Sequence, residues 1–333
     1  MDLLRTSLDY SYDLVKRPLF RITKNDAETT HNLLVLFSKI LNRTGLEKVM
    51  LDNESNYLDN SINISNAAGL NKNGKISPMF WNYLGFDRSV IGTVTGEFWP
   101  GNKRPRIKRH LPNESLINWV GWANDGAKII AKRVDSYKDY DLPITINLGA
   151  TPDPNLTLRE KISDLEKTVK LFRKIFSVDR FEYNPSCQNI GVSMEENLKL
   201  LEVAVKIIKE NALSHQELYV KVSPDMNERE ISKTIKATYD SVEGYVTTNT
   251  TTRHKHPQGS GSGEILYPPS LRTQKEFYNK LKDTSKRIIA CGGINSIKRI
   301  IERRTYGAEE FQILTPLIYS GPKLLRNLRM GLP

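Results

Sequence analysis

The sequence predicts a (β/α)8 barrel, also called a TIM barrel, with a helical extension at its N-terminus. Three observations predict this α/β fold: the chain length, an alternation of strand-like and helix-like segments, and polar residues at the ends of the strand-like segments. The 333 residues are 38% hydrophobic and 26% charged, and barrels commonly use this length for a single domain.

Eight short apolar or β-branched runs are the predicted strands. They cover residues 62–66, 89–93, 144–148, 180–184, 218–222, 244–248, 287–291 and 310–314. Between them lie segments in which apolar residues recur with helical spacing. The predicted helices cover residues 126–134, 158–175, 194–211, 228–239, 270–281, 297–304 and 323–330.

The residues that follow the strands help to choose between a closed barrel and a doubly wound open sheet, since both folds alternate strands and helices. Polar or glycine residues come directly after almost every strand, as at Asn66, Asn147 and Thr248. Barrel enzymes build their sites from these strand ends, whereas an open sheet does not need them all. We therefore predict the closed barrel.

Two segments stand outside the repeat. The polar stretch 96–117 is rich in Pro, Gly and Arg, which is typical of a lid or an extra substrate wall. Residues 1–45 carry the apolar stripes of an amphipathic helical pair, and Asn25 to Glu28 form a plausible capping box at the start of the second helix. We expect residues 46–333 to form the barrel.

Composition limits the class of protein. No run of eighteen apolar residues occurs, and the N-terminus lacks the apolar core of a secretory signal, so we expect an intracellular protein. The two cysteines, Cys187 and Cys291, are too few for a zinc site alone, and we predict no metal. The net charge of +11 does not by itself choose among nucleic acid, an anionic membrane and anionic ligands.

The last two strand ends carry a phosphate-binding pattern. Gly292 and Gly293 follow the seventh strand, and Leu314 and Thr315 lie at the end of the eighth. Glycine lets backbone N–H groups approach an anion, and barrels commonly hold phosphate at these two loops. We favour phosphate binding over a simple turn.

Lysines and amides at other strand ends predict a polar, anionic ligand. Lys221 lies in an apolar strand, where its charge needs a partner that an anionic ligand would supply. Lys72 could meet such a ligand or be a solvated loop residue. Amides suit a heterocycle with N–H and C=O groups, although each alone could be a turn residue. These amides are Asn66, Asn118, Asn147, Asn184, Asn189 and Asn249.

Cys187 directly follows the fourth strand. A thiol there could act as a general acid or base, or could be a small buried side chain.

Ten segments in this order resemble the dihydroorotate dehydrogenase family. They are NAAGLNKNG, IGTVTGEFWPGNKRPRIKR, LINWVGWANDG, INLGATP, EYNPSCQN, LYVKVSPDM, YVTTNTTT, GSGSGEIL, IIACGGINS and GAEEFQILTPLIYSGP. The N-terminal segment YDLVKRPLFRITKNDAETTH extends the likeness to the quinone-linked, membrane-associated class.

The resemblance implies that FMN accepts electrons from dihydroorotate, which becomes orotate, in pyrimidine (UMP) biosynthesis. It makes Cys187 the catalytic base that removes the C5 proton. The pyrimidine and its carboxylate would be held by Lys72, Asn118, Asn189, Asn249 and Thr250. FMN would be held by Ala68, Gly69, Thr93, Asn147, Asn184, Lys221, Thr248, Gly263, Gly292, Gly293, Leu314 and Thr315.

This chain also departs from the family pattern. The quinone-linked class generally has serine at the base position, and the soluble class has cysteine, as here at Cys187. Gln188 replaces a proline, and Asn71 replaces an aspartate beside Lys72. Where the family pattern reads N-R-x-G-F-N, this chain has Trp119, Trp122 and Ala123 in place of Arg, Phe and Asn. These changes lie in the expected walls of the site, so they allow an altered substrate or acceptor.

For the helical pair, the resemblance implies a path for ubiquinone or menaquinone, with His31 and Arg109 near the quinone. Basic Lys16, Arg17 and Arg21 could rest on anionic lipid. We therefore expect peripheral contact with the cytoplasmic face of the cell or inner membrane. Helices that only cover the barrel are the alternative.

Two other functions fit the sequence. One is an FMN barrel enzyme acting on dihydrouridine in tRNA; no nucleic acid is expected, since no added RNA-binding domain follows the eighth unit. The other is a flavin-binding relative without turnover.

Overall fold

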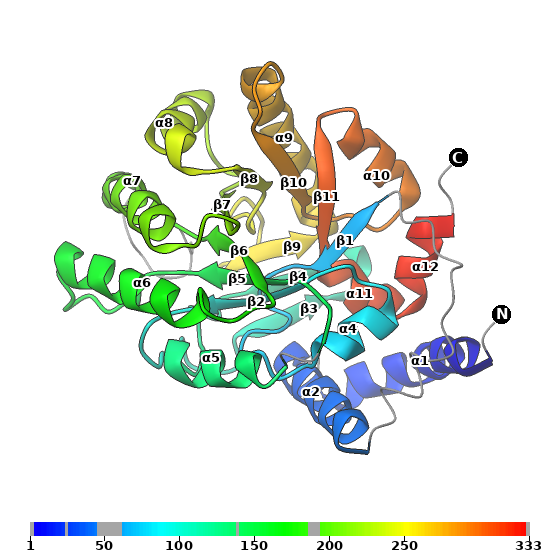
Figure 1. The fold of residues 1–333 in the computed structure, drawn as a ribbon. Helices are drawn as coiled ribbons and strands as arrows, with labels where there is room; N and C mark the ends of the chain where they lie inside the picture. The colour runs from blue at the N-terminus through cyan, green and yellow to red at the C-terminus, as the bar shows by residue number, and fades with distance from the viewer. Residues whose placement is uncertain (1–2, 24–25, 45–61, 138–139, 186–193, 331–333) are drawn as a thin grey trace.

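The computed structural model describes residues 3–23, 26–44, 62–137, 140–185 and 194–330. Eight parallel strands form one sheet in the order β1-β11-β10-β8-β7-β6-β5-β2, with helices around them (Figure 1). The predicted barrel is confirmed, and each predicted strand bound lies within two residues of the observed one. The strands are β1 (Asn63–Asn66), β2 (Ser89–Val94), β5 (Ile144–Leu148), β6 (Val178–Tyr183), β7 (Glu217–Val222), β8 (Gly244–Thr247), β10 (Arg287–Cys291) and β11 (Ala308–Ile313).

The barrel closes where β1 meets β2. The buried Asn66 side chain donates to Val90 O at 2.7 Å and accepts from Val90 N at 2.9 Å. A parallel bridge joins Ser65 to Arg88 one step earlier along the strands. An amide can replace a backbone peptide in such a pairing because it carries both a donor and an acceptor. Asn66 therefore completes the ladder that the two edge strands begin.

Two helices begin at capping boxes that their sequences contain. Thr157 with Glu160 and Asn227 with Glu230 form capping boxes at the starts of two helices. The helices are α1 (Leu3–Ile22), α2 (Ala27–Thr44), α4 (Pro78–Leu84), α5 (Ala127–Asp135), α6 (Leu158–Phe172), α7 (Met194–Asn211), α8 (Glu228–Thr238), α9 (Tyr267–Leu281), α10 (Ile297–Arg304), α11 (Thr315–Ser320) and α12 (Lys323–Met330). The sequence did not predict α4 or α11, because both segments are too short to repeat apolar residues with helical spacing.

A small antiparallel sheet stands outside the barrel. It joins β3 (Ile107–His110), β4 (Ser115–Asn118) and β9 (Ser260–Gly263) in that order. The predicted polar insertion 96–117 thus ends in a hairpin. Glycine disfavours strands, which hides β9 in the sequence; here a Cβ on Gly263 would lie 2.4 Å from Glu114 O, so the close pairing with β4 needs glycine.

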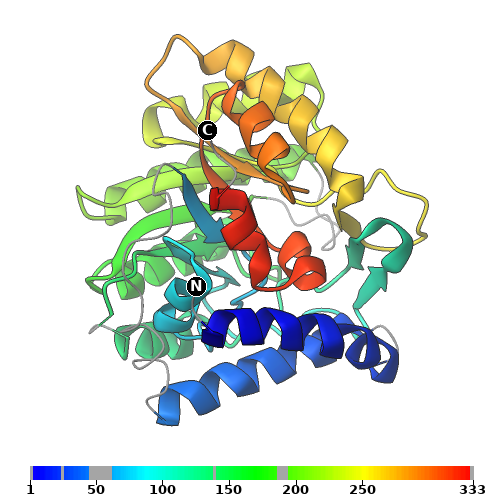
Figure 2. The ribbon, with the colours of Figure 1, turned by 90° about the vertical axis from the view of Figure 1, so that its right-hand side faces the viewer.

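The N-terminal helices lie side by side along one flank of the molecule, with α1 against α11 and α12 (Figure 2). Tyr12 donates to Ile318 O, Lys16 donates to Tyr319 O at 3.2 Å, and Phe20 packs edge-on against Tyr319. The predicted helical pair is therefore present. Its predicted boundary with the barrel, at residues 45 and 46, falls outside the described residues.

The predicted capping box at the start of α2 is wrong in its use of Glu28. Asp26 caps the helix instead, since its carboxylate accepts from Glu28 N at 3.0 Å and from the Thr29 hydroxyl at 2.7 Å. The Glu28 side chain turns to Arg106, with Arg106 Nη2 and Glu28 Oε1 2.9 Å apart. A charged guanidinium is a stronger partner for a carboxylate than a backbone N–H is. Asn25 lies outside the described residues.

A cluster of charges fills the amino-terminal end of the barrel. Arg180 on β6 donates to Glu310 on β11 at 2.6 Å and to Glu217 on β7 at 2.8 Å. Its guanidinium also lies 4.7 Å from the centre of the Tyr219 ring, and Arg287 pairs with the other oxygen of Glu217. This network ties together strands that are not neighbours, so it serves stability.

We predict that Arg180→Leu lowers the free energy of unfolding by about 3 kcal/mol, because it leaves the carboxylates of Glu217 and Glu310 without their shared cation. Chemical denaturation measures the change. The matched control is Lys170→Leu, which breaks the exposed pair with Glu166 on α6 and should cost about 0.5 kcal/mol or less. Equal losses in the two variants would contradict a special role for the cluster.

Candidate functional site

A cavity opens at the carboxyl ends of the barrel strands, as the fold predicts for a barrel enzyme. Loops after β1, β2, β6, β8, β10 and β11 line it, together with Lys221 on β7, parts of the small sheet and the start of α2. The cavity brings together most of the residues predicted to bind a ligand. They are Ala68, Gly69, Lys72, Thr93, Asn118, Asn184, Lys221, Thr248, Asn249, Thr250, Gly263, Gly292, Gly293, Leu314 and Thr315.

Four residues predicted at the ligand site stand apart from this set. Asn66 is buried and does not line the cavity, since its amide pairs with the backbone of Val90. Cys187 and Asn189 lie outside the described residues, so their roles stay predictions. Asn147 is fully buried and does not line the cavity. Its amide donates to Glu182 at 2.6 Å, while its Oδ1 atom has no hydrogen-bond partner.

A chain of hydrogen bonds orients the amides on one rim. Asn249 donates to the side-chain oxygen of Asn184 at 3.1 Å, and Asn184 donates to the Thr93 hydroxyl at 3.2 Å. The Asn249 side-chain oxygen accepts from the backbone of Thr250 at 2.9 Å. Because these residues come from the ends of β2, β6 and β8, the chain fixes three loops relative to one another. Such pre-organised amides suit a planar polar ligand.

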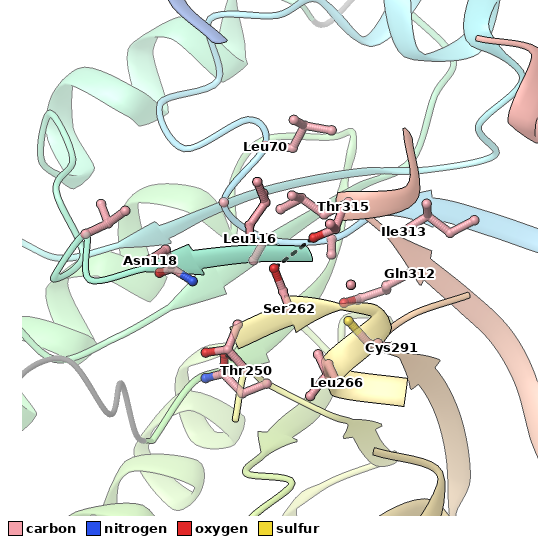
Figure 3. Close-up of a pocket in the computed structure, with 18 of the residues that line it drawn as sticks. Leu70, Leu116, Asn118, Thr250, Ser262, Leu266, Cys291, Gln312, Ile313 and Thr315 are labelled. Carbon is pink, nitrogen blue, oxygen red and sulfur yellow. Dashed lines mark hydrogen bonds between the residues drawn. The ribbon is translucent and has the colours of Figure 1, made fainter. Parts of the chain in front are cut away.

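Glycines and hydroxyl groups lie together where the sequence predicts phosphate binding. Gly292 and Gly293 have φ angles of +122° and +66°, which favour glycine. Figure 3 shows Ser262 facing Thr315, with their hydroxyl oxygens 2.8 Å apart. Hydroxyl groups beside the backbone of glycines suit an anion with several oxygen acceptors.

Lys221 lies at the base of the cavity and has a partner within the protein. Its Nζ atom donates to Gln312 at 2.8 Å and lies 3.3 Å from Glu182 Oε1. The other oxygen of Glu182 accepts from Gln312 at 2.6 Å. The sequence predicts an anionic ligand as the partner of Lys221, whereas in the structure a carboxylate of β6 is that partner.

A second charge cluster surrounds Lys72. The buried Glu28 carboxylate accepts from Arg106 and from Arg104 at 3.0 Å, and lies 3.7 Å from Lys72 Nζ. Burial favours the neutral acid, but Arg106, Lys72 and Arg104 outweigh it and hold the pKa of Glu28 below its usual value. Three cations thus face one carboxylate, and Lys72 is the one of them that lines the cavity. The contact between Glu28 and Lys72 links α2 to the loop after β1.

His31 lies on α2 and Arg109 on β3, and only His31 lines the cavity. Burial, aided by the charge of Lys72, lowers the pKa of His31 to about 4, so its imidazole is neutral at pH 7. Arg109 is buried on β3, where its guanidinium lies 4.0 Å from the centre of the Phe20 ring and donates to Thr30 at 2.5 Å. Arg109 therefore supports the packing of α1 and α2 on the small sheet.

Comparison with known proteins agrees with this geometry. A family model described as dihydroorotate dehydrogenase matches residues 50–333. The chain belongs to the dihydroorotate dehydrogenase family.

Two relatives, both named dihydroorotate dehydrogenase (quinone), match over nearly their whole length. The protein of Natronomonas pharaonis is 29% identical over 340 residues, covering 96% of this chain and 93% of its own. The protein of Helicobacter acinonychis is 30% identical over 343 residues, covering 95% and 92%. A solved structure, the dihydroorotate dehydrogenase of Eimeria tenella in complex with ferulenol, has a TM-score of 0.78 at 20% identity and covers 92% of this chain and 90% of its own. That likeness supports the barrel fold.

Some residues that depart from the dihydroorotate dehydrogenase pattern line the cavity, and others do not. Trp122 and Ala123 line the cavity and change its wall. Trp119 does not line the cavity and stacks on His256, with ring centres 6.1 Å apart. Asn71 is buried and pairs with the backbone of Ile76, so it shapes the turn that carries Lys72. Gln188 lies outside the described residues.

Several cavity residues were missed from the sequence. Gln312 hydrogen-bonds Lys221, and Ser262 hydrogen-bonds Thr315. Cys291 lies beside Gln312 (Figure 3). An available signal was the period of two along the strands, since Gln312 lies two residues before Leu314, and Glu182 two before Asn184. Among the residues that the structure describes, no group of His, Cys, Asp and Glu is placed to hold a metal ion.

The depressed pKa of His31 makes stability depend on pH. The folded protein holds this imidazole neutral down to about pH 4, whereas the unfolded chain protonates it below its usual pKa of 6.5. Its contribution is therefore present above pH 6.5 and is lost as the pH falls toward 4. Between pH 7 and pH 5, His31→Gln should lose less unfolding free energy than the wild type does, by about 1 to 2 kcal/mol. Denaturation curves at both pH values measure this, and equal losses would contradict a buried neutral His31.

Proposed function

We propose that this protein oxidises dihydroorotate to orotate with FMN as its cofactor and passes the electrons to a quinone. The observation that carries the proposal is the convergence of Lys72, Asn118, Asn249 and Lys221 with the paired glycines on one cavity in a member of this family. The two relatives named above carry the quinone in their names.

The donors of the cavity fit FMN. A phosphate needs backbone approach and hydroxyls, which Gly292, Gly293 and Thr315 would supply at one end. The amide chain from Thr93 to Asn249 and the ammonium of Lys221 would hold the polar edge of the flavin ring. When bound, FMN supplies the electron acceptor for the substrate.

The charge around Lys72 fits a carboxylate substrate. Burial lowers the pKa of Lys72, although the Glu28 carboxylate opposes this shift. Lys72, Arg104 and Arg106 all pair with the Glu28 carboxylate, so three cations share one anionic partner. A dihydroorotate carboxylate would therefore enter a site that still has positive charge to compensate it. Asn118 and Asn249 would then pair with the N–H and C=O groups of the ring.

We assign the base that takes the proton from C5 of dihydroorotate to Cys187, on its place directly after the fourth strand of the barrel. A thiol can be tuned toward the thiolate in a polar site. The C5 proton would leave the substrate on the side that faces the loop after β6.

Cys187→Ala should keep the yellow flavin spectrum and slow reduction of the flavin by dihydroorotate by about a hundredfold, the usual scale for loss of a general base. Stopped-flow mixing without oxygen measures the rate. Unchanged rates would remove Cys187 from the mechanism. A wild-type flavin that dihydroorotate does not bleach would overturn the proposed substrate and favour a relative without turnover.

The quinone would reach the flavin between the helical pair and the barrel. On this side Ala27, Ile107, Leu116 and Ile318 give the cavity an apolar wall. The outer face of the pair is also apolar, with Leu14, Leu33, Leu36 and Ile40 between 46% and 60% exposed. No described helix is long and apolar enough to cross a membrane. An exposed apolar face beside basic residues suits peripheral contact with anionic lipid.

We predict that Leu36→Gln combined with Ile40→Gln weakens binding to anionic lipid vesicles by about tenfold or more, because two apolar side chains no longer enter the bilayer surface. Vesicle sedimentation measures the change. Flavin reduction by dihydroorotate should stay at the wild-type rate. The matched control is Phe176→Gln, which removes an apolar side chain that is 89% exposed before β6; an equal loss of binding there would contradict contact through α2.

A further inference from the structure

A buried carboxylate lies directly beneath the floor of the cavity. Glu182 on β6 is 1% exposed and does not line the cavity, while its partners Lys221 and Gln312 do. Two residues further along β6, Asn184 reaches the rim. Side chains two apart on a strand point to the same side, so Glu182 occupies the layer of the barrel interior just below the site.

Every oxygen of Glu182 is held. Oε1 accepts from Asn147 at 2.6 Å and lies 3.3 Å from Lys221 Nζ, and Oε2 accepts from Gln312 at 2.6 Å. Gln312 also accepts from Lys221 at 2.8 Å, which closes a ring of three side chains from β6, β7 and β11. Two amide donors and one ammonium thus surround this buried carboxylate.

Lys221 keeps its charge in this ring. Burial alone would lower the pKa of Lys221, but the neighbouring Cys291 and Glu182 outweigh it and raise this pKa. Burial in turn raises the pKa of the Cys291 thiol, and the Glu182 carboxylate lies 3.3 Å from the Lys221 ammonium as its ion-pair partner. The floor of the cavity is thus an ammonium facing the ligand, with its counter-charge one layer behind.

We propose that Glu182 is a positioning residue that sets the redox potential of the bound flavin by neutralising Lys221. The inference rests on the proposed function, since it needs FMN in the cavity. Reduction adds negative charge to a flavin, and a nearby cation stabilises the reduced form more than the oxidised form. Glu182 offsets that cation, and so it keeps the potential lower than Lys221 alone would. In a buried site these charges act with little screening by water.

Glu182→Gln is the direct test. Glutamine keeps the size and can still accept a hydrogen bond from Asn147 or Gln312 through its amide oxygen, but it removes the negative charge. We expect the variant to favour reduced over oxidised FMN by about tenfold or more relative to the wild type. For a two-electron couple, a tenfold change is about 30 mV in midpoint potential. Anaerobic titration of the holoenzyme against a reference dye measures this shift without any turnover.

Glu217→Gln is the matched control. Glu217 starts β7, the strand that carries Lys221 four residues later, about 13 Å along the strand. It pairs with Arg180 and Arg287. Its loss should leave the potential of the flavin at the wild-type value. Glu182→Asp, which keeps the charge, should also stay near that value.

The outcomes are distinct. A raised potential in Glu182→Gln alone supports the inference. An unchanged potential, or an equal shift in Glu217→Gln, overturns it while leaving the proposed function intact. A purified wild type that binds no FMN overturns the proposed function, and the inference falls with it.

If Glu182→Gln does not fold, two other variants give the answer. Lys221→Gln leaves Glu182 without its cation and should lower the potential. Adding Glu182→Gln to Lys221→Gln removes both charges, which buried pairs tolerate better than the loss of one partner. The double variant should then have a higher potential than Lys221→Gln, and equal potentials would overturn the inference.

Discussion

The structure depends on the closure of the barrel between β1 and β2, where the Asn66 side chain binds both backbone groups of Val90. Closure brings the loops of the two edge strands of the sheet to one mouth. Without it, β1, whose loop carries Lys72, and β2, which carries Thr93, would lie at opposite edges of an open sheet. A side-chain amide thus completes the scaffold on which the cavity is built.

Buried charges are arranged in three places along the barrel, and each has a separate role. Arg180 and its glutamates tie strands together at the amino-terminal end. Lys221 and Glu182 form a balanced pair under the floor of the cavity. Around Lys72, cations outnumber the single carboxylate of Glu28, which fits a place where an anionic ligand binds. Because Glu28 belongs to α2, the same contact couples the helical pair to the Lys72 side of the cavity.

The barrel and most of the cavity could be predicted because both follow from local patterns. Apolar runs of strand length and polar residues at their ends gave the strand bounds and placed residues such as Asn184 and Gly292 at the mouth. What the sequence could not give depends on contacts between distant segments. The strand β9 exists only because β4 pairs with it, and the partners of Glu28 and Lys221 lie far away in the sequence. Cys187 remains a prediction from the sequence.

The most direct test is a crystal structure of the protein with FMN and orotate. The account predicts that FMN lies against Lys221 with its phosphate at Gly292 and Gly293, and that the orotate carboxylate contacts Lys72 while Asn118 and Asn249 bind the ring. A cavity without FMN, or orotate bound away from Lys72, would contradict it.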